Sequence, residues 1–266
     1  MAAAQLVRDR GICEPVDLAV VLGAGLGPVA EMLDAPMVIS YQELPGFPQT
    51  AATHHPGRLL IGVQQGFRVA YLQSRAHFYG CGDAGGMTNA LETMAFLGAW
   101  TLLLAATAES VRPGLYPGNI AIITDHINVS GINPLGGALA TERCVNLVDA
   151  YDPRLRQRLR KASAGAGVSL QEAIYMWFPG PVFETPAEVK AARQLGADAV
   201  GMSIVPEVVI ARKLGLRVAA LAVITNFAAG FSGGNPSLEE TQRGALAGTI
   251  GLKRLVRKFL ATKDEM

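Results

Sequence analysis

Charge and cysteine are both scarce in this sequence. Of its 266 residues only 17% are charged, with 23 basic against 22 acidic side chains, so no positive field of the kind that recognises duplex nucleic acid is expected. The three cysteines, Cys13, Cys81 and Cys144, are an odd number without CxxC spacing, which argues against a disulfide framework and a zinc knuckle. We expect a cytoplasmic protein with no nucleic-acid partner.

Long apolar segments and low-complexity linkers are also missing. The apolar, uncharged stretch between Glu92 and Glu109 is shorter than the roughly 20 residues of a membrane-spanning helix, and the amino terminus lacks the apolar core of a signal peptide. Half of the residues are hydrophobic, which is enough for a large core in a chain of this length. We expect a single domain, residues 1–266, with no membrane partner.

Short apolar runs alternate with helical patterns between Gly180 and Gly230. Thr185–Glu188 is a capping box with proline at the first helical position, and Gly196 is placed to end that helix. Val218–Ile224 is an almost continuous apolar run, which is typical of a strand covered on both faces of a sheet. The pattern predicts an α/β fold.

Polar residues follow the predicted strands of this region. The polar residues at the three strand ends are Glu184, Ser203 and Asn226, and each forms a pair with the residue before it: Phe183, Met202 and Thr225. Ligands of α/β sheets bind beyond the carboxyl ends of strands, and these side chains suit a flat ligand rich in heteroatoms. Taken singly, the polar residues could be a helix-start charge, a cap and a turn residue, but those explanations do not require all three to follow strands.

A glycine turn follows the apolar run Leu18–Leu22. The residues Gly23–Pro28 predict a tight turn into a helix, whose exposed backbone N–H groups would bind an anion such as phosphate. A dinucleotide fold is the alternative, since Glu43 lies at the distance of a ribose-binding acid. Pro28 stands where that motif needs its third glycine.

A second anion-binding group follows the predicted strand Val69–Gln73. Arg75 and His77 are two residues apart and so share one side of an extended segment, where guanidinium and imidazole can hold an oxyanion together with the glycine turn and Ser203. His54 and His55 are adjacent and point in opposite directions on an extended chain, so we expect no metal between them.

The runs GPVFET, GADAVGMSIVPEVVIAR and ITN resemble those of the trimeric purine nucleoside phosphorylases, a family that includes methylthioadenosine phosphorylases. The resemblance extends from Val20 to about Leu260. It implies one domain with a central mixed β-sheet flanked by helices, a homotrimer, and phosphorolysis of purine nucleosides to free base and ribose 1-phosphate. Phosphate is then a co-substrate, and neither a cofactor nor a metal is expected.

The resemblance also implies three groups of site residues. Phosphate would be bound by Ala24, His55, Arg75, His77, Thr107 and Ser203. The base would be bound by Phe183, Glu184, Thr225 and Asn226, and the ribose by Tyr79, Met202, Gln242 and Cys144. Asn226, Glu184 and His77 are the expected catalytic residues, with Asn226 at N7 and Glu184 at N1–H of the purine. Asparagine rather than aspartate at 226 accompanies 6-oxopurines, such as inosine and guanosine, in this family.

The sequence departs from the family pattern at four places. Ala24 replaces a serine, Ala106–Ser110 replaces NAAGG, Cys144 replaces an aromatic residue and Gln242 replaces a histidine. Glu109 would repel a bound phosphate unless it points away. These departures leave two alternatives open: a 5′-methylthionucleoside phosphorylase, and a noncatalytic binding member of the family.

Overall fold

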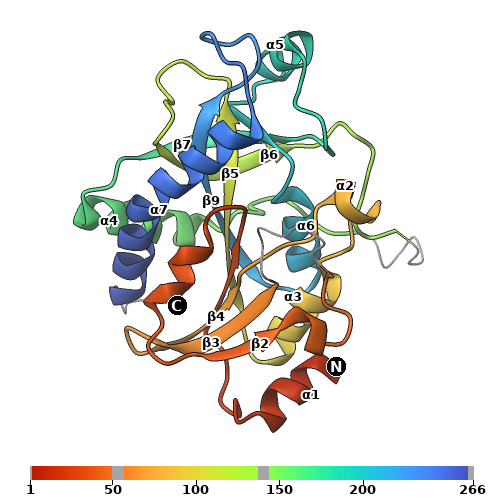
Figure 1. The fold of residues 1–266 in the computed structure, drawn as a ribbon, viewed down its shortest axis with the longest axis vertical. Coiled ribbons are helices and arrows are strands. Elements are labelled where there is room, and N and C mark those ends of the chain that lie inside the picture. The colour runs from red at the N-terminus through yellow and green to blue at the C-terminus, as the bar shows by residue number, and fades with distance from the viewer. Residues whose placement is uncertain (1, 50–56, 137–143, 263–266) are drawn as a thin grey trace.

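The computed structural model describes residues 2–49, 57–136 and 144–262, and within them the chain forms one mixed β-sheet of nine strands (Figure 1). The strands are β1 (Leu18–Leu22), β2 (Met37–Ser40), β3 (Arg58–Gln64), β4 (Phe67–Leu72), β5 (Thr101–Ser110), β6 (Ile120–Ile127), β7 (Leu170–Trp177), β8 (Ala199–Gly201) and β9 (Arg217–Phe227). Their order in the sheet is β2-β3-β4-β1-β5-β8-β7-β6-β9. The α/β class with a central mixed sheet is confirmed.

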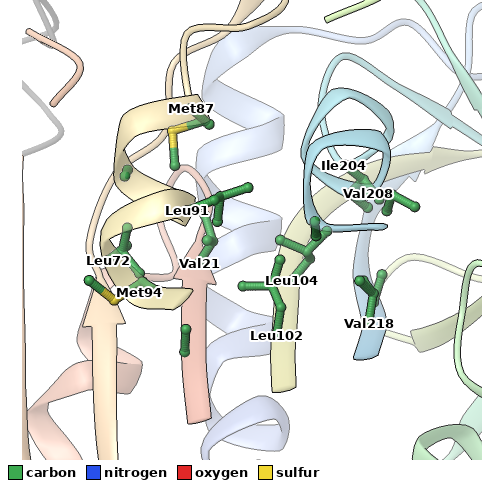
Figure 2. Close-up of a cluster of buried hydrophobic side chains, with 14 of the residues drawn as sticks. Val21, Leu72, Met87, Leu91, Met94, Leu102, Leu104, Ile204, Val208 and Val218 are labelled. Carbon is green, nitrogen blue, oxygen red and sulfur yellow. The ribbon is translucent and has the colours of Figure 1, made fainter. Parts of the chain in front are cut away.

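Helices cover both faces of this sheet. One face carries α1 (Ala2–Asp9), α3 (Thr88–Phe96) and α6 (Val205–Lys213), and the other carries α4 (Pro153–Ala166), α7 (Leu238–Ala261) and the 3-10 helix η1 (Gly27–Met32). The short α2 (Phe78–Cys81), η2 (Tyr41–Glu43) and α5 (Pro186–Gln194) lie at the sheet's ends and edges. Figure 2 shows Leu91 of α3 and Val208 of α6 on the first face, near Val21 and Leu104.

The continuous apolar sequence of β1 is explained by these two layers. Leu18, Val20 and Leu22 point into the layer that contains α7, whereas Ala19 and Val21 point into the layer that contains α3. Successive side chains of a strand alternate between faces, so a strand buried on both sides needs apolar residues at every position. The strand predicted at Leu18–Leu22 has those same bounds.

Strand β5 connects two parts of the sheet. It pairs with β1 through Thr101–Ala105 and with β9 along its length, and its last two residues, Glu109 and Ser110, also pair with β8. Because β8 pairs with β7, β7 with β6, and β6 with β9, the strands β5, β8, β7, β6 and β9 close into a ring. Strands β4, β1, β5 and β9 are parallel, so their carboxyl ends lie at one edge.

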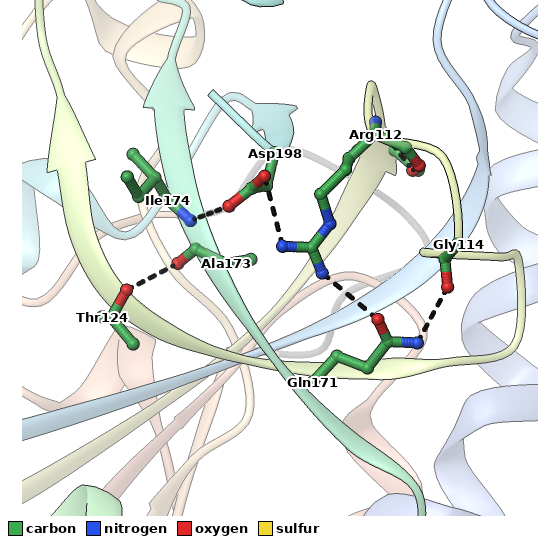
Figure 3. A network of polar contacts seen from close by, with 8 residues as sticks. Arg112, Gly114, Thr124, Gln171, Ala173, Ile174 and Asp198 are labelled. Atoms are coloured by element: carbon green, nitrogen blue, oxygen red, sulfur yellow. Dashed lines mark hydrogen bonds and ion pairs between the residues drawn. The ribbon is translucent and has the colours of Figure 1, made fainter. Parts of the chain in front are cut away.

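A polar network braces this ring where β5 turns into β6 (Figure 3). Arg112 forms an ion pair with Asp198 at 3.2 Å and donates a hydrogen bond to Gln171 Oε1 at 3.2 Å. Gln171 donates to the Gly114 carbonyl at 2.9 Å, and Asp198 accepts from the Ile174 N–H at 2.9 Å. The side chains therefore link the turn to β7 and to the start of β8.

The capping box predicted at Thr185–Glu188 is confirmed. Thr185 and Glu188 form the reciprocal capping box of α5, and Ser237 caps α7 by accepting from the Glu240 N–H. Gly196 lies just beyond α5 with a φ of 97°. The glycine turn leads into the short 3-10 helix η1 rather than an α-helix, with Pro28 at its start, which corrects the expectation only in helix type.

Helix α7 lies very close to β9 because two of its glycines face that strand. A Cβ at Gly248 would lie 2.2 Å from Val223 Cγ1, and one at Gly244 would lie 2.7 Å from Thr225 Cα. Real Cβ atoms do not approach other atoms so closely, so a larger residue would push the helix away. The first turn of α7 is thereby held near the carboxyl end of β9.

Gly248→Ala is expected to lower the free energy of unfolding by about 1–3 kcal/mol, the usual cost of overpacking. This cost should exceed the gain of about 1 kcal/mol that alanine brings over glycine inside a helix. Gly251→Ala is the matched control, because its Cβ would lie 3.3 Å from the flexible end of Ile120. Urea unfolding measures both, and equal stability of the two variants would contradict the tight contact.

Candidate active site

A cavity of about 890 Å³ opens at the carboxyl ends of the parallel strands. Most residues that the sequence assigned to the site line it: Ala24, Arg75, His77, Tyr79, Thr107, Phe183, Glu184, Met202, Ser203, Thr225 and Gln242. Segments more than 200 residues apart in sequence thus meet in one space. Asn226 and Cys144 are not among the lining residues, and His55 lies outside the described residues.

Two glycines of the turn after β1 have no room for a side chain. A Cβ at Gly23 would lie 3.1 Å from the Ala105 carbonyl oxygen and 3.2 Å from Ala106 Cα, because the turn packs directly on β5. Gly25 has a φ of 74°, and a Cβ there would lie 2.7 Å from Ala245 of α7. Both positions therefore need glycine, for steric reasons and, at Gly25, for backbone conformation.

Arg75 is buried and already has partners on one side of its guanidinium group. Nε lies 3.1 Å from Oε1 of Glu207 on α6, and Nη2 donates to the carbonyls of Ala105 at 3.0 Å and Val21 at 3.4 Å. Nη1 has no hydrogen-bond partner among the described residues and lies 3.8 Å from where a Cβ of Gly23 would be. The whole fork was expected to bind an anion, but only Nη1 remains available for one beside the glycine turn.

His77 and Tyr79 continue this wall. Their rings stack with centroids 4.9 Å apart and planes 16° apart, so the imidazole is positioned by the phenol ring. A Cβ at Gly180 would lie 2.7 Å from Tyr79 Cδ1 and 2.7 Å from Met202 Sδ. Tyr79 and Met202, both predicted to contact a sugar, therefore lie against the same point of the backbone.

Ser203 is held in place by its backbone. Its N–H donates to the Tyr175 hydroxyl at 3.2 Å, and the next residue, Ile204, has a φ of 71°. A β-branched residue in the left-handed region is strained by about 1–3 kcal/mol, and such strain is concentrated at functional sites. Sequence reasoning missed this feature, because nothing in the residue type isoleucine signals a positive φ.

A β-bulge arranges the other end of the cavity. The β5–β9 register shifts between Ala108, which pairs with Ile224, and Glu109, which pairs with Asn226. Thr225 is therefore the extra residue on β9. A bulge of this kind re-aims side chains near the end of a strand, and here it brings Glu109 and Asn226 opposite one another.

The Asn226 side chain is buried and bonded to its own strand. Its carboxamide oxygen accepts from the Thr225 hydroxyl at 2.6 Å, and its NH₂ group donates to the Phe227 carbonyl at 3.1 Å. It thus lies behind Thr225 rather than on the cavity surface. Thr225 and Asn226 lie within β9, not after it, and Glu184 lies seven residues beyond the end of β7. The expectation that each pair follows a strand directly is correct only for Met202-Ser203.

Two carboxyl groups line this end of the cavity. Glu184 is 5% exposed and Glu109 is 6% exposed, and Glu184 Oε1 and both Glu109 oxygens have no hydrogen-bond partner among the described residues. Burial raises the pKa of each carboxyl group to about 7. The nearby Asn226 amide lowers the pKa of Glu109 in part, whereas the charges of Glu184 and Glu240 raise it.

Glu109 is not among the site residues expected from the sequence, which indicates only that it would repel a bound phosphate unless it points away. The structure places it on the cavity wall, and Leu238 and Thr241 of α7 line the wall beside the predicted Gln242. The α7 residues carried a signal, because an i, i+3, i+4 spacing puts them on one face of the helix.

The described residues contain no cluster of three or more His, Cys, Asp or Glu side chains that could hold a metal ion. In the same part of the chain, no helix combines the length and the apolar character needed to cross a bilayer. The polar side chains that line the cavity include those of Arg75, His77, Ser203, Glu109 and Glu184.

Known proteins share both the sequence and this fold. The profile of the phosphorylase superfamily matches residues 17–261. The chain is 37% identical over 232 residues to purine nucleoside phosphorylase 1 of Geobacillus stearothermophilus, covering 86% of this chain and 84% of the relative. It is 36% identical over 260 residues to the purine nucleoside phosphorylase of Mycobacterium tuberculosis, covering 97% and 94%.

Solved structures agree with these relatives. The crystal structure of Schistosoma mansoni purine nucleoside phosphorylase in complex with inosine has a TM-score of 0.92 and 28% identity, covering 99% of this chain and 96% of the other. Another crystal structure of the Schistosoma mansoni enzyme holds adenosine. Because the profile and relatives above 30% identity both span most of its length, the chain belongs to the purine nucleoside phosphorylase family of the phosphorylase superfamily.

Proposed function

We propose that this pentosyltransferase acts on 6-oxopurine ribonucleosides such as inosine and guanosine, with phosphate as co-substrate. The observation that carries the proposal is one cavity that holds two kinds of polar group. An arginine nitrogen without a hydrogen-bond partner among the described residues lies beside a glycine turn, and buried carboxyl groups lie beside an asparagine. An anion and a purine can therefore be bound side by side. Asn226, rather than aspartate, supports the 6-oxo preference.

At the base end, Glu184 accepts a hydrogen bond from N1–H in its ionised form. Asn226 donates from its NH₂ group to N7 when it turns away from the Phe227 carbonyl. As the glycosidic bond breaks, its electrons move onto the purine, and a donor at N7 stabilises the charge that develops there. Asn226 makes this turn when the base binds, because stabilisation of this kind depends on donors that are in place before the bond breaks.

At the anion end, Arg75 Nη1, His77 and the Ser203 hydroxyl bind phosphate, joined by backbone N–H groups at Ala24 and Thr107 and by His55. Glu207 neutralises part of the Arg75 charge and fixes its orientation. Tyr79 and Met202 pack on the ribose and hold its anomeric carbon between phosphate and base. Phosphate then attacks the oxocarbenium-like sugar from the face opposite the departing purine.

We also propose a cytoplasmic homotrimer. Cys144 is exposed and does not line the cavity of its own subunit, so a ribose contact by this residue requires a neighbouring subunit. Sedimentation analysis tests the assembly, and a monomeric enzyme with full activity would contradict a shared site.

A 5′-methylthionucleoside is the second candidate substrate. Leu238, an apolar residue, lines the cavity beside Gln242 at the start of α7, and an apolar wall favours a methylthio group over a hydroxyl. Comparing kcat/KM for inosine and 5′-methylthioinosine separates the two. A ratio that favours the methylthio substrate by tenfold or more, on the order of one buried sulfur and methyl group, would overturn the ribonucleoside preference.

Asn226→Ala is expected to reduce kcat for inosine about a hundredfold or more, because it removes the donor to N7. Release of hypoxanthine, measured in a coupled assay, gives the rate. Thr225→Val, which keeps the carboxamide but removes the hydroxyl that holds its oxygen, should lower kcat less than the alanine variant does. Near-normal turnover by the alanine variant would reject the role of Asn226.

Arg75→Lys is expected to raise the KM for phosphate about tenfold or more while changing the KM for inosine much less, because lysine cannot pair with Glu207 and also present a second nitrogen to the anion. Arg68→Lys on β4 is the matched control, since Arg68 forms a peripheral ion pair with Glu14. Initial rates at varied phosphate and inosine separate the effects. Equal KM changes for both substrates would place Arg75 elsewhere.

A further inference from the structure

Glu109 is a buried acid that the mechanism above does not use. It lines the cavity, lies opposite Asn226 across the β5–β9 bulge, and has two oxygens without hydrogen-bond partners among the described residues. A buried carboxyl group without partners is costly. Its position on the cavity wall therefore indicates a ligand group that completes its hydrogen bonds.

The position of Glu109 relative to its neighbours indicates which ligand group this is. It pairs with Asn226 across the β5–β9 ladder and lines the same cavity as Glu184, whose charge raises its pKa. Along one edge, which spans both of its rings, a purine presents N1, the C6 substituent and N7 in that order. If Glu184 faces N1 and Asn226 faces N7, a side chain near both of them faces the C6 substituent.

We propose that Glu109 and Glu184 act as a pair that holds one proton when a base is bound, and that the position of this proton adapts the site to either 6-oxopurines or 6-aminopurines. With a 6-oxopurine, Glu184 is the carboxylate that accepts from N1–H, and Glu109 is the acid that donates to O6. With a 6-aminopurine, Glu184 donates to N1 and Glu109 accepts from the amino group. This role of the two carboxyl groups depends on the purine-binding site proposed above.

The surroundings favour a retained proton. Groups that face the pair include Glu240 on α7, which acts on Glu109, and Glu188 on α5, which acts on Glu184. From β9 the neutral Asn226 faces Glu109, and from β8 the uncharged Val200 pairs with it. Arg75, His77 and Asp83 line the same cavity, but the charge of Arg75 is matched by Glu207.

The pH dependence follows from the direction of the shifts. Burial raises the pKa of both carboxyl groups to about 7, so each is mostly protonated below this pH and mostly ionised above it. At pH 8 both carboxyl groups are mostly ionised when no base is bound, so base binding must take up one proton from the buffer. At pH 6 both groups are mostly protonated, and binding must release one.

Calorimetric titration with hypoxanthine or adenine, in the presence of inorganic phosphate and in buffers of different ionisation enthalpy, measures this proton. At pH 8 the wild-type enzyme should take up about one proton with either base, as two carboxyl groups of pKa near 7 require. Glu109→Gln should take up none with hypoxanthine, since its amide donates to O6, but still about one with adenine. Glu184→Gln should show the reverse pattern.

The pH profile of kcat/KM for inosine provides a second measurement. The wild-type value should fall by about tenfold per pH unit well above pH 7, where Glu109 loses its proton. Glu109→Gln should lose this alkaline decline and keep the acid decline caused by protonation of Glu184. Adenosine should show the opposite, with the acid decline lost in Glu109→Gln.

The pair is rejected if Glu109→Gln takes up as many protons with hypoxanthine as the wild type, or if it no longer binds either base. The outcome is separable from the proposed function. Proton uptake without turnover of any nucleoside would reject phosphorolysis and support the pair, whereas turnover of inosine without proton uptake would reject only the pair.

Discussion

The pairing of β5 with both β1 and β9 is the constraint on which the rest of the structure depends. Parallel pairing brings the ends of β1, β4, β5 and β9 to one edge, so that the glycine turn, the Arg75 segment and the Asn226 segment meet without long loops. The same strand then pairs with β8 through Glu109 and Ser110 and closes the ring. The site is thus built largely on strands and their first following residues, which hold side chains more rigidly than loops do.

The buried charges of the cavity are arranged in two groups. At one end, Arg75 and Glu207 balance one another, and a pair of this kind is retained for orientation more than for stability, because desolvation consumes most of its attraction. At the other end, Glu109 and Glu184 have no basic partner of this kind among the described residues, and burial makes their ionisation unfavourable. An incoming anion therefore meets a fixed hydrogen-bond donor, whereas an incoming base meets carboxyl groups that can gain or lose a proton.

Local features of the sequence predicted the elements better than the directions of side chains. The unbroken apolar run of β1 and the capping box of α5 depend only on neighbouring residues, and both were predicted correctly. Glu109 and Asn226 face each other because of a register shift between strands more than 100 residues apart, and no local pattern encodes that shift. For the same reason the sequence could not show that Glu207, on a separate helix, forms an ion pair with Nε of the Arg75 guanidinium group. The strand that was expected to end at Phe183-Glu184 ends at Trp177 of β7, whose first half is partly exposed and carries no clear alternation that would mark its bounds.

The strained backbone at Ile204 has a consequence for ligand recognition. Because the fold already forces this residue to a φ of 71° and fixes the Ser203 N–H on Tyr175, the segment has little conformational entropy left to lose when a ligand arrives. A glycine at 204 would relax the strain and give the segment more conformational freedom in the ligand-free protein. Because the Ile204 side chain is also fully buried in the core, glycine would leave a cavity there, so weaker association with the ligand would accompany a less stable fold.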